Sequence, residues 1–323
     1  MTSTPVGAPA RPALDTVSRL ATALAENLSV VIRGKPEALR LTLVALLGGH
    51  HLLLEDVPGV GKTLLAKALA RSLGGSFRRI QGTPDLLPTE LTGVEVFHKD
   101  TEQWEFRPGP LFANVVLVDE INRATPRTQS ALLEAMEEGQ VTVDGRTWGL
   151  PQPFFVVATQ NPVEHAGTFP LVEGQRDRFG LTVQLGHPHR SAERELLLGA
   201  GGVPSLDSLE PVCGPSELAD AIAAVRGVHC APAVADYVID VCAATRAHPE
   251  VVLGASARAS LTLLHAAKAH AALTGRGFVS PDDVQAVATA TLAHRLMLAG
   301  GENLDQATSL VRRLLESVPV PRA

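Results

Sequence analysis

The feature that most constrains the fold is one glycine-bearing stretch, LLLEDVPGVGKT, at residues 52–63. An apolar run opens it, and an amphipathic helical pattern, KTLLAKALARSL, continues from its end. A strand, a glycine loop and a helix in this order aim backbone N–H groups and the positive end of the helix at one point, which makes an anion-binding site. The strict phosphate-loop pattern is glycine, four residues, then Gly-Lys-Thr. Here Asp56 stands at the first glycine position, so the segment is unusual for a nucleotide site.

The side chains at the end of this loop have the chemistry that a bound nucleotide requires. Lys62 would reach the terminal phosphates, and the hydroxyl of Thr63 would ligate Mg²⁺. Asp56 lies at the strand exit, from which an aspartate can point away from the phosphates. The alternative is a glycine-rich turn in which the Gly-Lys-Thr triplet is accidental. We predict that ATP is bound by Asp56, Val57, Pro58, Gly59, Val60, Gly61, Lys62, Thr63 and Leu64.

Apolar runs around this segment predict a parallel α/β sheet. From Val30 to about Gly186, strand-like runs alternate with helical patterns such as RTQSALLEAMEEG. Long apolar runs suit a sheet covered on both faces, and the alternation is typical of parallel strands joined by helices. The predicted strands are HHLLLED, FRRI, NVVLVDE, PFFVVATQ and LTVQLG.

The chain changes character after the last predicted strand. A stretch that contains Pro and Gly, GGVPSLDSLEPVCGPSE, is followed by an Ala-rich helical pattern that runs to the end. Within that pattern, SPDDV predicts a helix start capped by Ser280. We expect a flexible tail at residues 1–14, a nucleotide-binding core at 15–190, a flexible boundary near 188–215 and a helical domain at 210–323.

Polar residues end two more of the apolar runs. In VVLVDE, Asp119 could hold the Mg²⁺ shell, and Glu120 could orient and deprotonate the attacking water. In VVATQNP, Asn161 could hold that water from the opposite side. Either carboxylate alone would more often be a solvated strand end, and an Asn before Pro is typical of a turn. After a phosphate loop, however, the carboxylate pair indicates hydrolysis of a nucleoside triphosphate.

Two arginines are candidates for contact with the γ-phosphate. Arg178, in EGQRDRFG, could act as an arginine finger on the ATP of a neighbouring subunit, although spacing alone favours a pairing with Asp177 or Glu173 on a helix. Arg258, in GASARASL, lies in the first turn of a predicted helix of the second domain. Facing the cleft, it would sense the nucleotide of its own subunit. Its alternative is a surface role.

These residues together resemble the MoxR group of AAA+ ATPases, from about Val30 to the C-terminus. The resemblance implies an α/β fold, with an AAA+ parallel-sheet P-loop core and a C-terminal helical lid domain. It also accounts for Asp56, because aspartate is common at the first P-loop position of this group. The motifs that carry the resemblance are EDVPGVGKT, IQGTPDLLPTELTG, GPLFANVVLVDEINRATPRTQSALLEAMEEGQVTVDG, ATQNPVEHAGTFPLVEGQRDRF and GASARA.

The resemblance assigns a role to each candidate residue. Arg176 stands where the family usually has Leu, so either Arg176 or Arg178 is the finger. Ala257 replaces a usual Pro and Gly82 a usual Phe, and we expect neither change to touch a catalytic role. The implied roles are Lys62 and Thr63 as Walker A, Asp119 and Glu120 as Walker B, Asn161 as sensor 1, Arg178 as finger and Arg258 as sensor 2.

The resemblance also implies partners. ATP would bind at the domain junction and at a subunit interface, so a ring of identical subunits, a hexamer, is expected, with ATP and Mg²⁺ as ligands. The ring would remodel or mature partner proteins in the manner of a chaperone. Such client proteins often carry a von Willebrand A-type metal-binding domain.

Two predicted hairpins are candidates for contact with a client. Residues 94–109 have a turn at Lys99-Asp100-Thr101, and residues 141–150 have an Asp144-Gly145 turn. Both hairpins could project toward a ring pore. The alternative is that their aromatic residues, Trp104, Phe106 and Trp148, only pin the hairpins onto the core.

Composition weighs against other classes of function. The net charge of −6 argues against a broad nucleic-acid footprint. A DNA motor stays open as an alternative, although the two hairpins together carry more acidic than basic residues. A nucleotide-gated scaffold without turnover also stays open, but it would be expected to lack Glu120 or the finger. We find no run of about 20 apolar residues that predicts a membrane span. The cysteines lack metal-ligand spacing and suit reduced thiols of a cytoplasmic protein: Cys213, Cys230 and Cys242.

Overall fold

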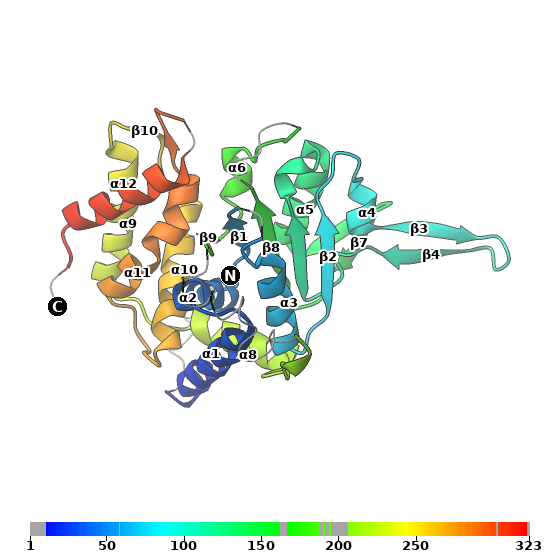
Figure 1. Ribbon diagram of the computed structural model, residues 1–323, viewed down its shortest axis with the longest axis horizontal. Coiled ribbons are helices and arrows are strands. Elements are labelled where there is room, and N and C mark those ends of the chain that lie inside the picture. The colour runs from blue at the N-terminus through cyan, green and yellow to red at the C-terminus, as the bar shows by residue number, and fades with distance from the viewer. Residues whose placement is uncertain are drawn as a thin grey trace, which may run out of the picture.

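A computed structural model describes residues 11–57, 59–161, 167–187, 190, 194, 206–301 and 303–321. A parallel sheet with helices on both faces forms the middle of the molecule (Figure 1). The C-terminal helices lie on one side of this sheet, and a long hairpin projects from the other side. This arrangement agrees with the α/β core and helical lid that the sequence predicts.

Among the described residues, five strands form the parallel sheet in the order β2-β5-β8-β1-β9. Each falls within or next to one of the five predicted strand segments, and the predicted parallel sheet is confirmed. Because all five strands run the same way, their carboxyl ends meet at one edge. The strands are β1 (Leu52–Glu55), β2 (Phe77–Gln81), β5 (Val115–Asp119), β8 (Phe155–Gln160) and β9 (Leu181–Val183).

Both faces of the sheet are buried because successive side chains of a strand point to opposite faces. In β1, Leu52 and Leu54 pack into a core shared with α1 (Arg11–Val31), α2 (Pro36–Leu47) and α3 (Lys62–Ser72). Leu53 faces the opposite core, which is shared with α5 (Pro126–Glu138). The phosphate-loop helix α3 and the helix α5 therefore lie on opposite faces of the sheet.

The N-terminal helix begins earlier than expected. α1 starts at Arg11, so the last part of the segment predicted to be a tail at 1–14 is helical. Leu14, Val17, Ala21, Leu24 and Leu28 are buried at helical spacing, and this burial is what orders the segment. Residues 1–10 lie outside the described part of the chain.

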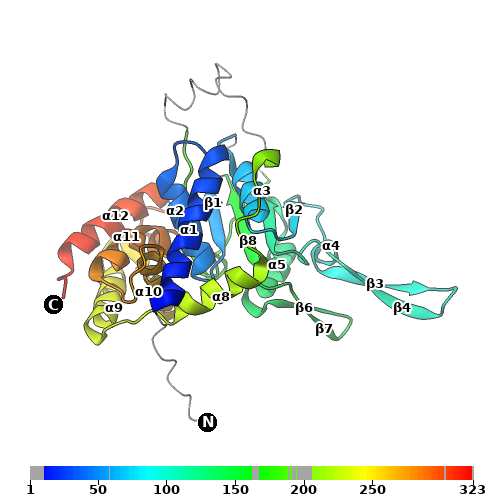
Figure 2. The same ribbon diagram turned by 90° about the horizontal axis from the view of Figure 1, so that it is seen from below.

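Both predicted hairpins form, and both project away from the lid helices (Figure 2). They are β3 (Gly93–His98) with β4 (Gln103–Pro108), and β6 (Gln140–Val143) with β7 (Arg146–Gly149). Asp144 and Gly145 both have positive φ, 47° and 79°, as a two-residue hairpin turn requires. The short helix α4 (Pro88–Thr92) leads into β3.

The two hairpins contact each other. The ring of Phe106 stacks on Trp148 with centroids 4.3 Å apart, and Arg146 pairs with Glu95 at 3.2 Å. Trp104 instead is 61% exposed and contacts Phe97, which is 44% exposed. The expected pinning role therefore fits Phe106 and Trp148, whereas Trp104 belongs to an exposed aromatic pair.

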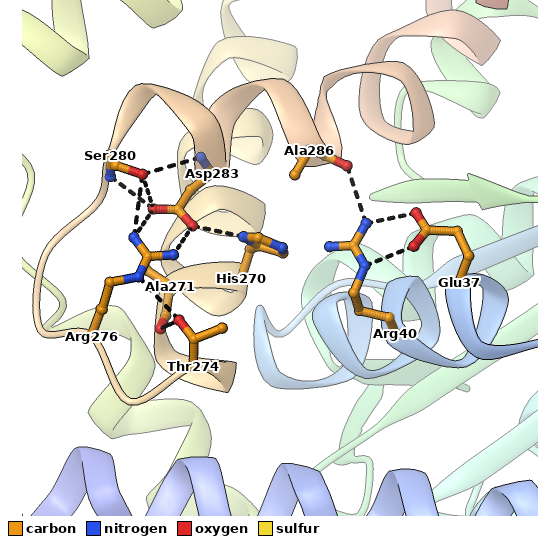
Figure 3. Close-up of polar contacts among 9 residues, drawn as sticks. All are labelled: Glu37, Arg40, His270, Ala271, Thr274, Arg276, Ser280, Asp283 and Ala286. Carbon is orange, nitrogen blue, oxygen red and sulfur yellow. Dashed lines mark hydrogen bonds and ion pairs between the residues drawn. The ribbon is translucent and has the colours of Figure 1, made fainter.

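The helices after residue 206 form the lid. A capping network marks the start of α11 (Pro281–Leu292), as the SPDDV motif predicts (Figure 3): the hydroxyl of Ser280 accepts from the backbone N–H of Asp283. Burial alone would raise the pKa of Asp283, but hydrogen bonds from His270, Arg276 and Ser280 hold this pKa below its usual value. The elements are η2 (Leu206–Ser208), α8 (Pro215–Arg226), α9 (Pro232–Ala247), β10 (Val251–Leu253), α10 (Ala257–Leu273), α11 (Pro281–Leu292), η3 (Ala293–Arg295), β11 (Met297–Leu298) and α12 (Leu304–Ser317).

Two arginines join the lid to the core. Arg40 of α2, held by an ion pair with Glu37, donates to the carbonyl of Ala286 in α11 at 3.3 Å (Figure 3). Arg295 of the lid is buried and donates to the core carbonyls of Phe179 and Gly180 at 2.6 and 3.0 Å. The lid therefore has a defined position against the sheet.

The predicted flexible boundary near 188–215 lies largely on residues that the structure does not describe. The three cysteines are free thiols. Within the described ranges, no helix is both long and apolar enough to cross a membrane.

Candidate nucleotide-binding site

The loop between β1 and α3 has the geometry of an anion cradle. Gly59 and Gly61 adopt φ values of 84° and 101°, which L side chains rarely adopt. A Cβ at either glycine would meet nothing within 4 Å, so the loop backbone is open to a ligand there. Gly61 is also the N-cap of α3, and the helix points its positive end at the loop. Pro58 lies outside the described residues.

Asp56 points away from this cradle, as its position at the strand exit led us to expect. Its carboxylate accepts from the backbone N–H groups of Gly186 at 2.6 Å and of Val57 at 2.9 Å. The side chain therefore ties the end of β1 to the segment after β9. An aspartate at the first P-loop position acts here as a backbone anchor, and its charge is not aimed at the phosphate position.

Lys62 lies at the mouth of the loop with its ammonium among carboxylates. Its Nζ donates to the carbonyl of Asp56 at 2.7 Å. Burial lowers the pKa of Lys62 from its usual value, while Asp56, Asp119 and Glu120 oppose that shift. A cation in this environment suits the binding of a polyanion.

Thr63 and Asp119 meet across the cradle. The Thr63 hydroxyl lies 3.5 Å from Oδ2 of Asp119, and Thr159 donates to Oδ1 of the same carboxylate at 3.3 Å. Hydroxyl and carboxylate oxygens are the ligands that Mg²⁺ prefers, usually with phosphate oxygens and waters completing the shell. The donor set fits Mg²⁺. Arg79 also pairs with Oδ2 of Asp119 at 2.7 Å, so this carboxylate already neutralises one cation.

Glu120 has a constrained backbone and a held carboxylate. Its φ and ψ of 55° and 51° place it in the left-handed region, which is uncommon for a residue other than glycine. Its N–H donates to the hydroxyl of Thr159 at 2.9 Å. Its Oε2 accepts from Gln81 at 3.0 Å and from Arg123 at 3.2 Å. These contacts hold the carboxylate, whose charge acts to raise the pKa of Lys62 in the loop.

Gly82 lies against the backbone of the Asp119-Glu120 pair. Its N–H donates to the carbonyl of Asp119 at 2.7 Å, and a Cβ there would lie 2.2 Å from the carbonyl oxygen of Glu120. No side chain fits at that distance. Gly82 therefore permits the close approach that supports the Asp119-Glu120 backbone in this chain.

Asn161 follows the end of β8, as predicted. It lines a cavity of about 140 Å³ together with Glu55, Gln160 and Arg176, next to the lid residue His294. Arg176 is only 8% exposed. The two candidates for the finger therefore differ in accessibility, because the side chain of Arg178 is 32% exposed.

Arg178 and Arg258 meet away from the phosphate loop of their own chain. Both contact the carboxylate of Glu137, near the end of α5, and the Arg178 distance is 3.4 Å. The neighbouring carbonyl of Met136 contacts His51 at 3.0 Å, which places this cluster near the amino end of β1. The phosphate loop follows the carboxyl end of β1. Arg258 therefore lies toward the end of β1 opposite to the phosphate loop of its own chain.

Sequence reasoning missed the residues that support the carboxylates. Gln81 and Thr159 carried a signal, because each lies at or near the carboxyl end of a predicted strand, where side chains from parallel strands converge. Arg79 shares a strand face with Gln81, two positions away. Arg123 lies three residues after Glu120, in η1 (Ile121–Arg123). Glu137 carried no such signal, since its position in a helical pattern does not indicate what packs beside it.

Comparisons with known proteins agree with this geometry. Residues 51–181 match the AAA family, described as "ATPase family associated with various cellular activities", and residues 243–314 match the AAA lid domain. The chain is 47% identical over 298 residues to the "Uncharacterized protein YeaC" of Bacillus subtilis, which covers 92% of this chain and 93% of that protein. It is 42% identical over 304 residues to the "Chaperone MoxR1" of Mycobacterium tuberculosis, covering 90% and 80% of the two chains.

A solved structure has the same architecture. A crystal structure from Cytophaga hutchinsonii superposes with a TM-score of 0.86 at 31% sequence identity, and the match covers 96% of this chain and 98% of that one. The match therefore spans nearly the whole of both chains.

Proposed function

The chain belongs to the MoxR family of AAA+ ATPases, and we propose that it assembles into a ring that uses ATP hydrolysis to remodel or mature partner proteins. The relatives and the family make it an ATPase. The ring, its clients and the roles of single residues are the proposal, and each rests on the contacts described above.

Lys62 and the loop backbone from Asp56 to Leu64 would hold the ATP phosphates. Thr63 and Asp119 would hold Mg²⁺, which when bound neutralises charge that develops on the phosphate oxygens. The 3.5 Å separation of their oxygens supports this assignment.

Glu120 would orient and deprotonate the attacking water. Gln81 and Arg123 hold its carboxylate from one side, and Thr159 holds its backbone. Asn161 would contact the same water from the end of the neighbouring strand. The backbone of Glu120 is held in the left-handed region because Thr159 and the close approach of Gly82 leave it little freedom.

The observation that most supports a ring is that the arginines and the phosphate loop lie apart in one chain. Arg178 and Arg258 lie near the amino end of β1, whereas Lys62 and Glu120 lie at the carboxyl edge of the sheet. A finger that cannot reach its own ATP must act on another subunit's. Arg178 is the better finger, because Arg176 is buried against the lid. A closed ring, and specifically a hexamer, supplies every site with a neighbour.

The exposed end of the longer hairpin would contact the client. Phe97 and Trp104 offer an aromatic pair on a projecting strand pair (Figure 1), and an exposed apolar group of this kind marks an interaction site. The printed name of the Mycobacterium relative, a chaperone, supports a protein client. A client with a von Willebrand A-type domain is the specific form of this proposal.

Mixing two inactive variants tests the divided site. Arg178→Ala rings should bind ATP and hydrolyse it slowly, and loss of such a finger can cost about 10³–10⁵-fold. Glu120→Gln rings should also be slow, by about 10²–10⁴-fold. When the two are mixed and exchange subunits, about a quarter of the interfaces, one-half multiplied by one-half, pair an intact phosphate loop with an intact finger. Activity should rise well above both parents; mixed rings without recovery would exclude the trans role.

A further inference from the structure

One carboxylate holds both candidate trans arginines. Oε2 of Glu137 lies 3.4 Å from Nη1 of Arg178, and Oε1 of Glu137 accepts from Nη2 of Arg258. The three side chains come from α5, from the segment after α6 (Glu173–Arg176) and from the first turn of α10. Each is partly exposed, at 36%, 32% and 47% for Glu137, Arg178 and Arg258, so a neighbouring molecule can reach the cluster.

The backbones under the two arginines are fixed to each other. The carboxylate of Asp177 accepts from the hydroxyl of Ser256 at 3.0 Å and from Nε of Arg295 at 2.8 Å. Asp177 precedes Arg178, and Ser256 is the N-cap of the helix that carries Arg258. Core and lid therefore present the two arginines from one rigid unit, in which only the side chains need to move.

The charges explain why a shared carboxylate matters. Two guanidinium groups at one place repel each other, and a single carboxylate neutralises one of the two charges. It thus keeps the pair together and leaves a net positive charge at the surface. A terminal phosphate brought by another subunit can compete for both arginines with more acceptor oxygens and more charge than Glu137 offers.

We propose that Glu137 is a positioning residue, which gathers Arg178 and Arg258 into one paired cation and passes that pair to the ATP of the adjacent subunit. The inference rests on the proposed function, since it presupposes that these arginines act in trans. It adds that they act as one unit and that the acidic side chain beside them is required for the unit to form.

The first test compares substitutions at two adjacent positions of α5. Glu137→Gln should leave ATP affinity, measured by calorimetry, unchanged and lower kcat by roughly 10–100-fold, the scale of a small misplacement of a reacting group. Glu137→Asp keeps the charge and should retain more activity than Glu137→Gln. Glu138→Gln removes the exposed carboxylate next to it and should behave as wild type. Wild-type kcat in Glu137→Gln would overturn the inference.

Mixed rings then show on which side of the interface Glu137 acts. Glu137→Gln mixed with Glu120→Gln should recover activity, because the Glu120→Gln subunit presents an intact arginine pair to an intact phosphate loop. That recovery also shows that the Glu137→Gln subunit is folded. Glu137→Gln mixed with Arg178→Ala should not recover, because both defects lie on the same donating face and no interface is complete.

The outcomes distinguish a failure of this inference from a failure of the proposed function on which it rests. If Arg178→Ala and Glu120→Gln fail to complement each other, the divided site itself is wrong. If they complement each other while Glu137→Gln also complements Arg178→Ala, the divided site stands. Glu137 would then serve its own phosphate loop, and the positioning role would be wrong.

Discussion

The hydroxyl of Thr63 lies 3.5 Å from Oδ2 of Asp119, although the two residues come from α3 and from the end of β5. Two hard oxygen donors converge on one point next to the phosphate loop. One of them is neutral, so its removal leaves the charge of the site unchanged.

We predict that Thr63→Val weakens the dependence of ATP hydrolysis on Mg²⁺. Valine keeps the shape of threonine and lacks the hydroxyl, so the apparent Mg²⁺ affinity should fall by at least the roughly 10–100-fold that loss of an indirect metal contact costs. Thr63→Ser keeps the hydroxyl and should stay near wild type. A Mg²⁺ titration of the ATPase rate measures this, and equal midpoints for valine and serine would remove Thr63 from the metal site.

Lys62→Ala should abolish ATP binding. The phosphates would lose the mobile cation of the loop, which is held at 2.7 Å from the Asp56 carbonyl and surrounded by carboxylates. Lys67→Ala, on the exposed side of the same helix, is the matched control and should bind ATP normally. Calorimetric titration with ATP is the measurement, and an unchanged affinity in Lys62→Ala would refute the phosphate-loop assignment.

The sheet and the central site residues could be read from the sequence because their signals are local. An apolar run that ends in Asp119-Glu120 carries both the strand and its chemistry, and parallel strands bring such ends to one edge. The strand order did not follow from any one segment. The close approach at Gly82 could not be read for a similar reason: the carbonyl of Glu120 comes from a neighbouring strand, which no local pattern reveals.

The placement of Arg258 shows more clearly what the sequence alone could not predict. Its position in the first turn of α10 was read correctly from GASARA, but the direction in which that turn faces depends on how the lid packs. Arg295, Asp177 and Ser256 lock that packing through contacts between residues far apart in the chain. In the sequence, Glu137 is likewise one of several acidic residues in a helical pattern. Only the fold shows that two arginines contact it.

Acid should destabilise the core through His51. Burial lowers the pKa of His51 from its usual 6.5 to about 4, although its hydrogen bond to the carbonyl of Met136 opposes the shift. The unfolded chain therefore binds more protons between these two values, and the free energy of unfolding falls as the pH drops from about 6.5 toward 4. His51 alone should account for about 2 kcal/mol between pH 7 and pH 5.

Denaturant unfolding at both pH values measures this contribution. His51→Gln should be less stable at pH 7, because its amide replaces the imidazole imperfectly, but its stability should fall less on acidification. His50, whose pKa burial lowers to about 3, remains in the variant and keeps part of the slope. Parallel pH dependence in wild type and His51→Gln would contradict the assignment.

Substitutions of the aromatic residues in the hairpins should differ in their effect on the free energy of unfolding. Phe106 stacks on Trp148 and also contacts Phe112 with centroids 5.4 Å apart, so Phe106→Ala should lower the free energy of unfolding by more than the roughly 0.5–1.5 kcal/mol of one aromatic pair. Trp104→Ala, at an exposed position, should change it by less than about 0.5 kcal/mol. Equal losses in denaturant unfolding would mean that both aromatics serve only the hairpin fold.

Tryptophan fluorescence can then show whether the exposed pair contacts a client. The chain has two tryptophans, so Trp148→Phe leaves Trp104 as the only emitter and Trp104→Phe leaves Trp148. Trp104, 61% exposed, should be quenched strongly by iodide in the free protein, whereas Trp148, stacked on Phe106, should be protected.

The client experiment adds a purified von Willebrand A-type domain and ATP to rings that also carry Glu120→Gln, so that turnover is slow. The domain should reduce the quenching of Trp104 and leave that of Trp148 unchanged. If binding of that domain is demonstrated by sedimentation and Trp104 stays as accessible as before, the client docks elsewhere and the hairpin is no contact surface. If the domain does not bind at all, that class of client is wrong, while the exposed pair remains open to other protein partners.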